Sequence, residues 1–236
     1  MLDFLGIGAQ KAGTTWLYHM LSRHPEVAFP AGKEVHFWDG QYERGIDWYR
    51  GLFAGDAGGR RQGEITPAYA ILPPERIAGI QAFQPALRIV YLLRNPLERA
   101  WSSALMALGR AEMTLDEASD QWFIDHFRSA GSMRRGDYET CLRNWYGVFD
   151  PGRILVLYYD DIARDPVGLL TRCCRHLGVD PGFFAALPEA EIRRRVFGGP
   201  GHPIRPTLLP VLRGLYHPRI RSLERFLGRD LRHWLG

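Results

Sequence analysis

Short, largely apolar runs separated by helical patterns constrain this chain more than any other feature of its sequence. Such runs occupy residues 2–8, 88–93 and 153–159. A run of this length without polar alternation is typical of a parallel strand that is covered on both faces. Strands that alternate with helices form doubly wound sheets. The pattern therefore predicts one α/β domain over residues 1–236, with a central parallel sheet flanked by helices.

Helices are expected where apolar residues recur at helical spacing between and after these runs. The expected ranges are about 14–23, 97–109, 206–217 and 219–227, with one more helix after Asp165-Pro166. In a doubly wound sheet, ligands bind beyond the carboxyl ends of the strands. The loops that follow residues 8 and 93 are therefore the first places to look for a functional site.

Composition and charge exclude several classes of protein. The 236 residues are 46% hydrophobic with a net charge of +4, which is the profile of a globular domain. No apolar run approaches the roughly 18 residues of a membrane span, and no signal peptide is apparent. The three cysteines lack metal-ligand spacing, so we expect a reducing compartment and no metal. Residues 193–236 hold ten arginines against two acids, which we interpret as a helical surface and not as a nucleic-acid site.

Residues 8–15 have the skeleton of a phosphate-binding loop: a glycine after a strand, four residues, a second glycine, and two threonines that open a helix. Backbone N–H groups and the helix dipole at such a terminus bind phosphate. In nucleoside triphosphatases a lysine follows the second glycine directly. Here Thr14 takes that place and Lys11 lies two residues before Gly13. A glycine-rich turn with a surface lysine would show the same pattern.

The second candidate loop carries a cation where a magnesium site needs a carboxylate. The run over residues 88–93 is followed by Arg94, whereas the corresponding strand of a magnesium-dependent triphosphatase ends in Asp. Ser102 lies eight residues later, on the expected helix. The two side chains can converge on one phosphate group without a metal. The plainer alternative is a strand-end cation and a solvated helical serine.

Together these two loops resemble the donor-binding motifs of sulfotransferases. Residues 10–17, Gln-Lys-Ala-Gly-Thr-Thr-Trp-Leu, resemble the 5′-phosphosulfate loop, and residues 94–102, Arg-Asn-Pro-x-Glu-Arg-x-x-Ser, resemble the 3′-phosphate motif. The resemblance implies a P-loop-like domain whose donor is 3′-phosphoadenosine 5′-phosphosulfate (PAPS). It assigns the donor contacts to Lys11, Ala12, Gly13, Thr14, Thr15, Trp16, Arg94 and Ser102.

Residues 33–39, Lys-Glu-Val-His-Phe-Trp-Asp, are the candidate acceptor segment. In an extended segment Glu34 and His36 share one face, and a carboxylate beside an imidazole can transfer protons. A half-buried strand with polar residues outward is the alternative. The stretch resembles that of glycan sulfotransferases of the heparan-sulfate type. This implies that Glu34 is the general base, that His36 supports it at the acceptor, and that Lys11 neutralises the departing oxygen.

Two further segments match this family less closely. Residues 63–69 resemble its Glu-Lys-Thr-Pro-x-Tyr stretch, except that Ile65 replaces the lysine. We expect Lys33 or an arginine to substitute for it; otherwise the activity is lower or the acceptor differs. Residues 195–203 correspond to the loop that closes over the nucleotide, with Arg193–Arg195 or Arg205 as candidate cations. Further candidates to reach the donor or acceptor are Arg134, Arg135 and Tyr138.

The sequence therefore predicts a cytoplasmic bacterial sulfotransferase. It would move the sulfuryl group from PAPS to a hydroxyl or amine of a carbohydrate or small molecule by in-line displacement. One alternative is a P-loop kinase-like phosphotransferase that uses ATP and magnesium, which Thr14 and Arg94 disfavour. The other is a non-catalytic nucleotide- or glycan-binding module, which Ile65 makes conceivable. The sequence indicates neither the acceptor nor an oligomeric state.

Overall fold

The computed structural model describes residues 1–55, 57–193 and 201–236. The chain forms two compact units, each of which takes two stretches of sequence. Unit 1 comprises Met1–Leu93 and Asn144–Phe197, and unit 2 comprises Arg94–Arg143 and Gly198–Gly236. The single domain expected over residues 1–236 stays a prediction, because a compact unit need not be a domain that folds alone.

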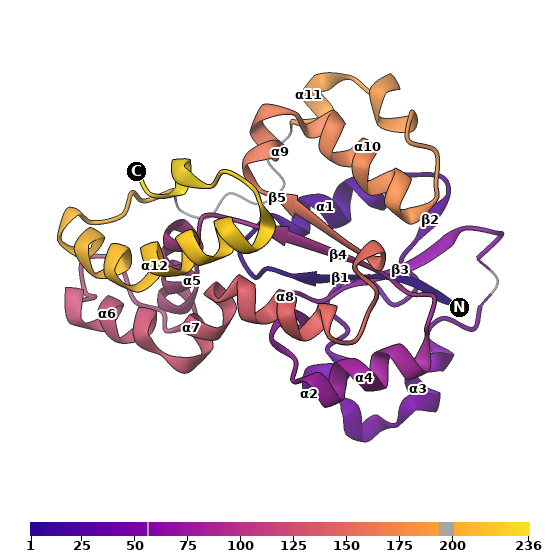
Figure 1. Cartoon of the computed structure of the whole chain (residues 1–236), viewed down its shortest axis with the longest axis horizontal. Coiled ribbons are helices and arrows are strands. Elements are labelled where there is room, and N and C mark those ends of the chain that lie inside the picture. The colour runs from indigo at the N-terminus through magenta and orange to yellow at the C-terminus, as the bar shows by residue number, and fades with distance from the viewer. Residues whose placement is uncertain (56, 194–200) are drawn as a thin grey trace. The chain divides into compact units, whose positions relative to one another are not determined.

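Unit 1 is built on a five-stranded sheet in which all neighbouring strands are parallel (Figure 1). The strand order is β2-β3-β1-β4-β5. The strands are β1 (Leu2–Gly8), β2 (Val27–Ala28), β3 (Arg61–Ile65), β4 (Arg88–Leu93) and β5 (Ile154–Tyr158). The three apolar runs of the sequence thus become β1, β4 and β5. The predicted central parallel sheet is confirmed, and β2 and β3 extend it beyond β1.

Helices cover both faces of this sheet (Figure 1). One face carries α1 (Thr14–Leu21), α9 (Asp160–Arg164), α10 (Pro166–Leu177) and α11 (Glu189–Ile192). The other carries α2 (Phe37–Gly40), α3 (Ile46–Gly51) and α4 (Pro74–Phe83). Since β1 and β4 are covered on both sides, they are buried along nearly their whole length, which explains why their sequences show no polar alternation.

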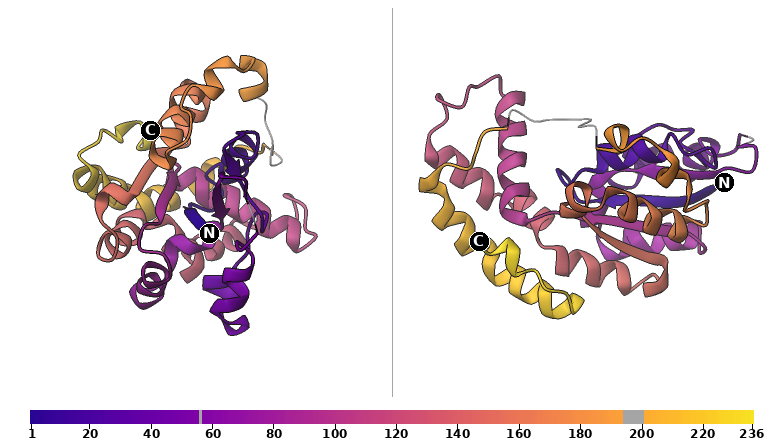
Figure 2. Two further views of the ribbon diagram at one scale, coloured as in Figure 1. Left: turned by 90° about the vertical axis from the view of Figure 1, so that its right-hand side faces the viewer. Right: turned by 90° about the horizontal axis from the view of Figure 1, so that it is seen from above.

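Unit 2 is helical and has α5 at its centre (Figure 2). Its helices are α5 (Pro96–Arg110), α6 (Asp120–Arg128), α7 (Ala130–Gly136) and α12 (Leu209–Leu227), and α8 (Tyr138–Tyr146) starts here and ends in unit 1. α5 packs against α6, α7 and α12. The fully buried Arg99 of α5 donates from Nη2 to the carbonyl oxygen of Ser132, 3.0 Å away, and so links α5 to α7.

One expectation for unit 2 is wrong. Residues 206–217 and 219–227 were expected to form two helices, but α12 is continuous from Leu209 to Leu227 with Pro218 inside it. A proline in a helix removes one backbone hydrogen bond. Buried apolar residues continue along one face of α12 on both sides of Pro218, namely Leu212, Tyr216, Ile220 and Leu223. Their packing outweighs the local preference to break the helix.

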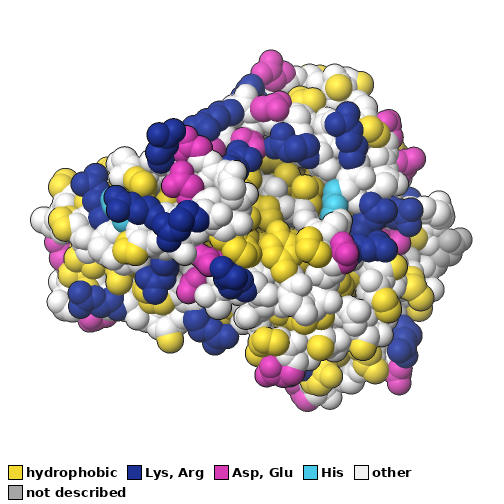
Figure 3. Space-filling view, viewed as in Figure 1, with side chains coloured by type: hydrophobic (Ala, Val, Ile, Leu, Met, Phe, Trp, Pro, Cys, Tyr) yellow, Lys and Arg dark blue, Asp and Glu magenta, His cyan; other side chains and the backbone are white. Residues whose placement is uncertain are grey.

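α12 carries four arginines, Arg213, Arg219, Arg221 and Arg225. Figure 3 shows Lys and Arg side chains, in dark blue, over the region where Figure 1 draws this helix. Burial, followed by repulsion from Arg213 and Arg221, lowers the pKa of His217 on the same helix. No helix among residues 1–55, 57–193 and 201–236 is long and apolar enough to cross a membrane.

Candidate active site

The loop between β1 and α1 is shaped by two residues with left-handed backbone. Lys11 has φ 66° and Gly13 has φ 87°. Gly13 is the N-cap of α1, and no described side chain caps this helix. A Cβ at Gly13 would lie 2.7 Å from the Ile162 side chain, so only glycine fits there. The first backbone N–H groups of α1 have no partner inside the helix. The loop therefore leaves backbone N–H groups available to an anion, and phosphate binding by it stays a prediction.

Neighbouring strands hold this loop in place. The Ala9 N–H donates to the Leu92 carbonyl oxygen at 2.7 Å, which ties the loop to the end of β4. Thr14 is buried at the start of α1, and the Trp16 indole Nε1–H donates to the Ile192 carbonyl oxygen at 3.0 Å. The Trp16 side chain is thus a packing group, and its backbone N–H is the part that can serve the donor.

The acceptor segment brings Glu34 and His36 together, but not as an extended strand. Both residues have left-handed backbone, with φ 62° and 57°, so the expectation of an extended segment is wrong. Because the chain turns at both residues, their side chains do not alternate between two faces as they would in a strand. His36 Nε2 lies 3.7 Å from Glu34 Oε2, so the expected pairing of acid and imidazole is present with a different backbone.

Two other charged groups complete this cluster. Lys33 Nζ forms an ion pair with Glu34 Oε1. Asp39 Oδ2 lies 3.0 Å from His36 Nδ1, which leaves Nε2 of the ring on the Glu34 side. Glu34 and His36 keep about two-fifths of their side-chain surface exposed, at 43% and 40%. Asp39 was not among the residues predicted to act at the site, although its spacing of three residues from His36 is a helical spacing.

The Lys11 loop and the Glu34 turn lie at the same edge of the sheet. The Glu34 N–H donates to the carbonyl oxygen of Ile65, the last residue of β3, at 3.0 Å. β3 pairs in parallel with β1, whose last residue, Gly8, leads into the phosphate loop. Carboxyl ends of neighbouring parallel strands are the expected place for a ligand in this fold. The predicted general base and the predicted phosphate loop therefore lie at the ends of neighbouring strands.

A buried carboxylate lies behind the Glu34 turn. Glu64 is fully buried and accepts hydrogen bonds from the hydroxyl groups of Thr66, at 2.6 Å, Tyr69, at 2.7 Å, and Tyr49. Burial raises the pKa of Glu64, and these three hydrogen bonds oppose that shift. The side chain of Ile65, beside it, is 1% exposed and packs against Gly6. Residue 65 is thus a core position, and its side chain offers nothing to a ligand.

The predicted 3′-phosphate residues belong to unit 2. Arg94 Nε and Nη2 donate to Glu98 Oε2 at 3.1 and 3.0 Å. The backbone of Arg94 is held by Tyr138, whose hydroxyl donates to the Arg94 carbonyl oxygen at 2.8 Å. Ser102 is half-buried on α5. Tyr138, which the sequence offered as a donor or acceptor contact, therefore supports Arg94 through its backbone.

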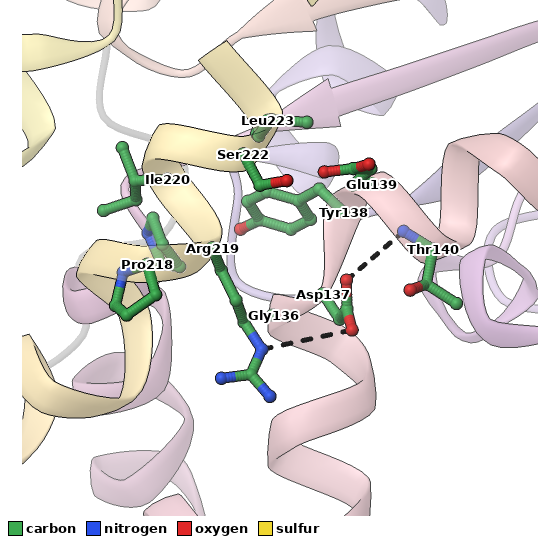
Figure 4. A pocket seen from close by; sticks show the side chains of 11 residues that line it. Gly136, Asp137, Tyr138, Glu139, Thr140, Pro218, Arg219, Ile220, Ser222 and Leu223 are labelled. Atoms are coloured by element: carbon green, nitrogen blue, oxygen red, sulfur yellow. Dashed lines mark hydrogen bonds and ion pairs between the residues drawn. The ribbon is translucent and has the colours of Figure 1, made fainter. Parts of the chain in front are cut away.

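Unit 2 also contains a pocket of about 450 Å³ between the start of α8 and α12 (Figure 4). Asp137 and Arg219 point toward each other in it, with Arg219 Nε 4.0 Å from Asp137 Oδ2. The hydrogen bond from Ser222, followed by that from Arg143, lowers the pKa of Glu139. The carboxylates of Asp137 and Glu139 are thus both paired with side chains of unit 2. Arg134 and Arg135 do not line this pocket.

The segment expected to close over the nucleotide, and the cations offered for it, stay predictions. Residues 194–200 of the expected nucleotide-closing segment lie outside the described residues. Arg193 and Arg205, offered as its cations, form ion pairs with Glu189, at 2.6 Å, and with Asp120, at 2.7 Å. In the described parts of the chain, no group of three or more His, Cys, Asp or Glu side chains is arranged to hold a metal ion.

The parallel sheet and its glycine-bounded loop define the class of P-loop-like α/β proteins. The family model described as a sulfotransferase domain matches residues 2–193. The chain belongs to the sulfotransferase family. This confirms the family that the two donor motifs predicted, and the kinase alternative is not favoured.

Named relatives agree with this assignment. Mouse heparan sulfate glucosamine 3-O-sulfotransferase 3B1 is 30% identical over 95% of this chain and 63% of that protein. Human heparan sulfate glucosamine 3-O-sulfotransferase 6 is 30% identical over 93% of this chain and 67% of that protein. The chain thus spans a little under two thirds of the length of the mouse relative.

Solved structures share the fold. A sulfotransferase from Alicyclobacillus acidocaldarius superimposes with a TM-score of 0.78 at 28% identity, covering 99% of this chain and 98% of that one. Mouse sulfotransferase SULT7A1, solved in complex with PAP, gives a TM-score of 0.58 at 17% identity, covering 96% of this chain and 88% of that one. The second likeness concerns the fold alone.

Proposed function

We propose that this chain transfers a sulfuryl group from PAPS to a hydroxyl or amine of a carbohydrate or small-molecule acceptor by in-line displacement. The observation that carries the proposal is the position of Glu34. The carboxylate of Glu34 is partly exposed, and the Glu34 N–H is hydrogen-bonded to the last residue of β3. β3 pairs with β1, the strand that leads into the predicted phosphate loop. Family membership and the heparan sulfate 3-O-sulfotransferase relatives support it. Bacterial origin and a cytoplasmic location stay predictions from the sequence.

The residues around the first loop fit the 5′ side of this donor. Among the described residues, no side chain caps the α1 terminus, and its first turn contains no acid; both features favour an anion there. We assign Lys11, with the backbone of Ala12, Gly13, Thr14, Thr15 and Trp16, to this end of the donor. Arg94 and Ser102 are assigned to its 3′-phosphate on their motif. When bound, the donor supplies the sulfuryl group and leaves as 3′,5′-diphosphoadenosine.

Glu34 would take the proton from the acceptor. Lys33 pairs with one carboxylate oxygen of Glu34, and His36 lies beside the other. Asp39 fixes the imidazole through Nδ1, so that its Nε2 stays toward Glu34 and the acceptor. As the acceptor oxygen forms its bond to sulfur, the S–O bond to the donor phosphate breaks. Lys11 would neutralise the charge that develops on that departing oxygen.

We expect 3′,5′-diphosphoadenosine to raise the melting temperature of this protein without magnesium, and ATP to do so much less. The reason is that Arg94 and Ser102 are assigned to a 3′-phosphate, which ATP lacks. Ligand at about 100 times its dissociation constant adds about 2.7 kcal/mol to the free energy of unfolding. Differential scanning fluorimetry with each nucleotide, with and without magnesium, measures this. A shift that needs magnesium, or an equal effect of ATP, would contradict the assignment.

A second prediction concerns residue 65, where this chain has isoleucine in place of the lysine of the family motif. Lys33→Met should lower turnover by several-fold, because an ion pair at a partly exposed site contributes up to about 1 kcal/mol. Ile65→Lys should not restore the loss, since residue 65 is a core position against Gly6, and burying an ammonium group there should lower the melting temperature. Sulfate transfer from radiolabelled PAPS to heparan sulfate oligosaccharides tests the single and double variants. Rescue by Ile65→Lys would show that the side chain reaches the site.

A further inference from the structure

The turn that carries Glu34 and His36 has an unfavourable backbone conformation. Neither residue is glycine, yet both have left-handed φ values, 62° and 57°. Such residues persist only where the surrounding structure determines their conformation, and they cluster at functional sites. The groups that impose this conformation are therefore as important to the site as the side chains that it presents.

Two sets of hydrogen bonds fix the ends of the turn. On one side, the Glu34 N–H donates to the Ile65 carbonyl oxygen. On the other side, the N–H groups of Phe37 and Trp38 both point to the hydroxyl oxygen of Tyr69, at 2.9 and 3.4 Å. This hydroxyl is the one side-chain partner of the two amides among the described residues. His36 is held between these two anchors.

Glu64 determines where the Tyr69 hydroxyl group donates its proton and where it accepts a hydrogen bond. An ionised carboxylate only accepts hydrogen bonds, so a hydroxyl beside it must donate. The Tyr69 hydroxyl donates to Glu64 Oε1 at 2.7 Å, and its oxygen lone pairs are left for the amides of α2. Glu64 and Tyr69 are both fully buried, so water does not compete for these bonds. Burial makes such a linked network stronger than the same bonds in water.

We propose that Glu64 is a positioning residue that acts through Tyr69 to hold Glu34 and His36 in their working geometry. The inference rests on the proposed role of Glu34 as general base. Two tyrosine hydroxyl groups donate to the Glu64 carboxylate, and we expect only one of them to matter for the turn. Tyr69 connects Glu64 to the backbone of the turn, whereas Tyr49 donates to the other oxygen, Oε2. Among the described residues, the hydroxyl group that the Phe37 and Trp38 amides reach is that of Tyr69 and not that of Tyr49.

The test compares Tyr69→Phe with Tyr49→Phe. Each variant removes one buried hydroxyl from Glu64 and keeps the aromatic ring, so the two should lose similar thermal stability. Three quantities are measured on each: amide hydrogen exchange at Phe37 and Trp38 by NMR, affinity for 3′,5′-diphosphoadenosine, and transfer from radiolabelled PAPS to O-desulfated heparan sulfate. We expect Tyr69→Phe to speed exchange at both amides and to lower turnover by up to about 10²-fold, the cost of misplacing a catalytic group by about 1 Å.

Nucleotide affinity should stay unchanged in both variants, and Tyr49→Phe should keep the exchange rates and turnover of the parent protein. Equal effects of the two variants on exchange would show a general loss of core packing and would overturn the proposal. So would unchanged exchange in Tyr69→Phe. If Tyr69→Phe does not fold, Glu64→Gln replaces it, because its amide no longer forces the Tyr69 hydroxyl to donate. Absence of transfer by the parent protein would count against the proposed function, while the exchange data would still decide the positioning role.

Discussion

Glu34→Gln is expected to lower turnover by about 10²–10⁴, which is the usual contribution of a positioned general base. Glutamine keeps the size and shape of the side chain but cannot take a proton. It also removes the negative charge that Lys33 and His36 now face. Affinity for 3′,5′-diphosphoadenosine should change little, because a carboxylate makes no favourable contact with an anionic donor. A loss of rate without a loss of donor binding marks an interaction made in the transition state.

Isothermal titration with 3′,5′-diphosphoadenosine and single-turnover sulfate transfer on the same preparations measure both quantities. Glu43→Gln is the matched control, because Glu43 is an exposed glutamate of the same unit. His36→Ala should cost less than Glu34→Gln, since His36 supports the base and does not take the proton. Normal turnover of Glu34→Gln would show that the base lies elsewhere, and His36 would be the first residue to test.

The sheet could be predicted from the sequence because its signal is local. The runs that become β1, β4 and β5 are mostly apolar, since β1 and β4 are buried along nearly their whole length and no residue of β5 is exposed. β2 has two residues and β3 contains Gln62 and Glu64, so neither shows an apolar run. The family resemblance identified the β3 region, and the hydrogen bonds of Glu64 explain how a carboxylate can occupy a buried strand.

The sequence predicted which residues form the site, but it did not predict their backbone conformation. The motif placed Glu34 and His36 together, and they are together. Their left-handed backbone could not be predicted, because the contacts that impose it come from Ile65 and Tyr69, about thirty residues later in the chain. The proposed positioning role of Glu64 could not be predicted either, because it depends on contacts between segments that are far apart in the sequence.

Lys11 provides the strictest test of the donor site. We expect Lys11→Ala to lower turnover by about 10²–10³, which is typical when one group that stabilises developing charge is removed. Arginine at this position should not restore the rate. A guanidinium group is planar and larger than an ammonium group, so it cannot act as a compact charge on one bridging oxygen. The left-handed backbone of Lys11, at φ 66°, lies in a loop that is tied to β4 through Ala9, and this leaves little freedom to accommodate the longer side chain.

The composition of the chain sharpens this test. Thirty residues are lysine or arginine, and Lys11 and Lys33 are the two lysines among them, so arginine serves wherever a general surface cation is enough. Single-turnover transfer at saturating PAPS compares Lys11→Ala, Lys11→Arg and Arg164→Ala, the last of which removes an exposed cation from the same unit. Arg164→Ala should turn over like the parent protein. Full activity of Lys11→Arg would mean that the loop needs only positive charge, and the direct contact between Lys11 and the departing oxygen would have to be abandoned.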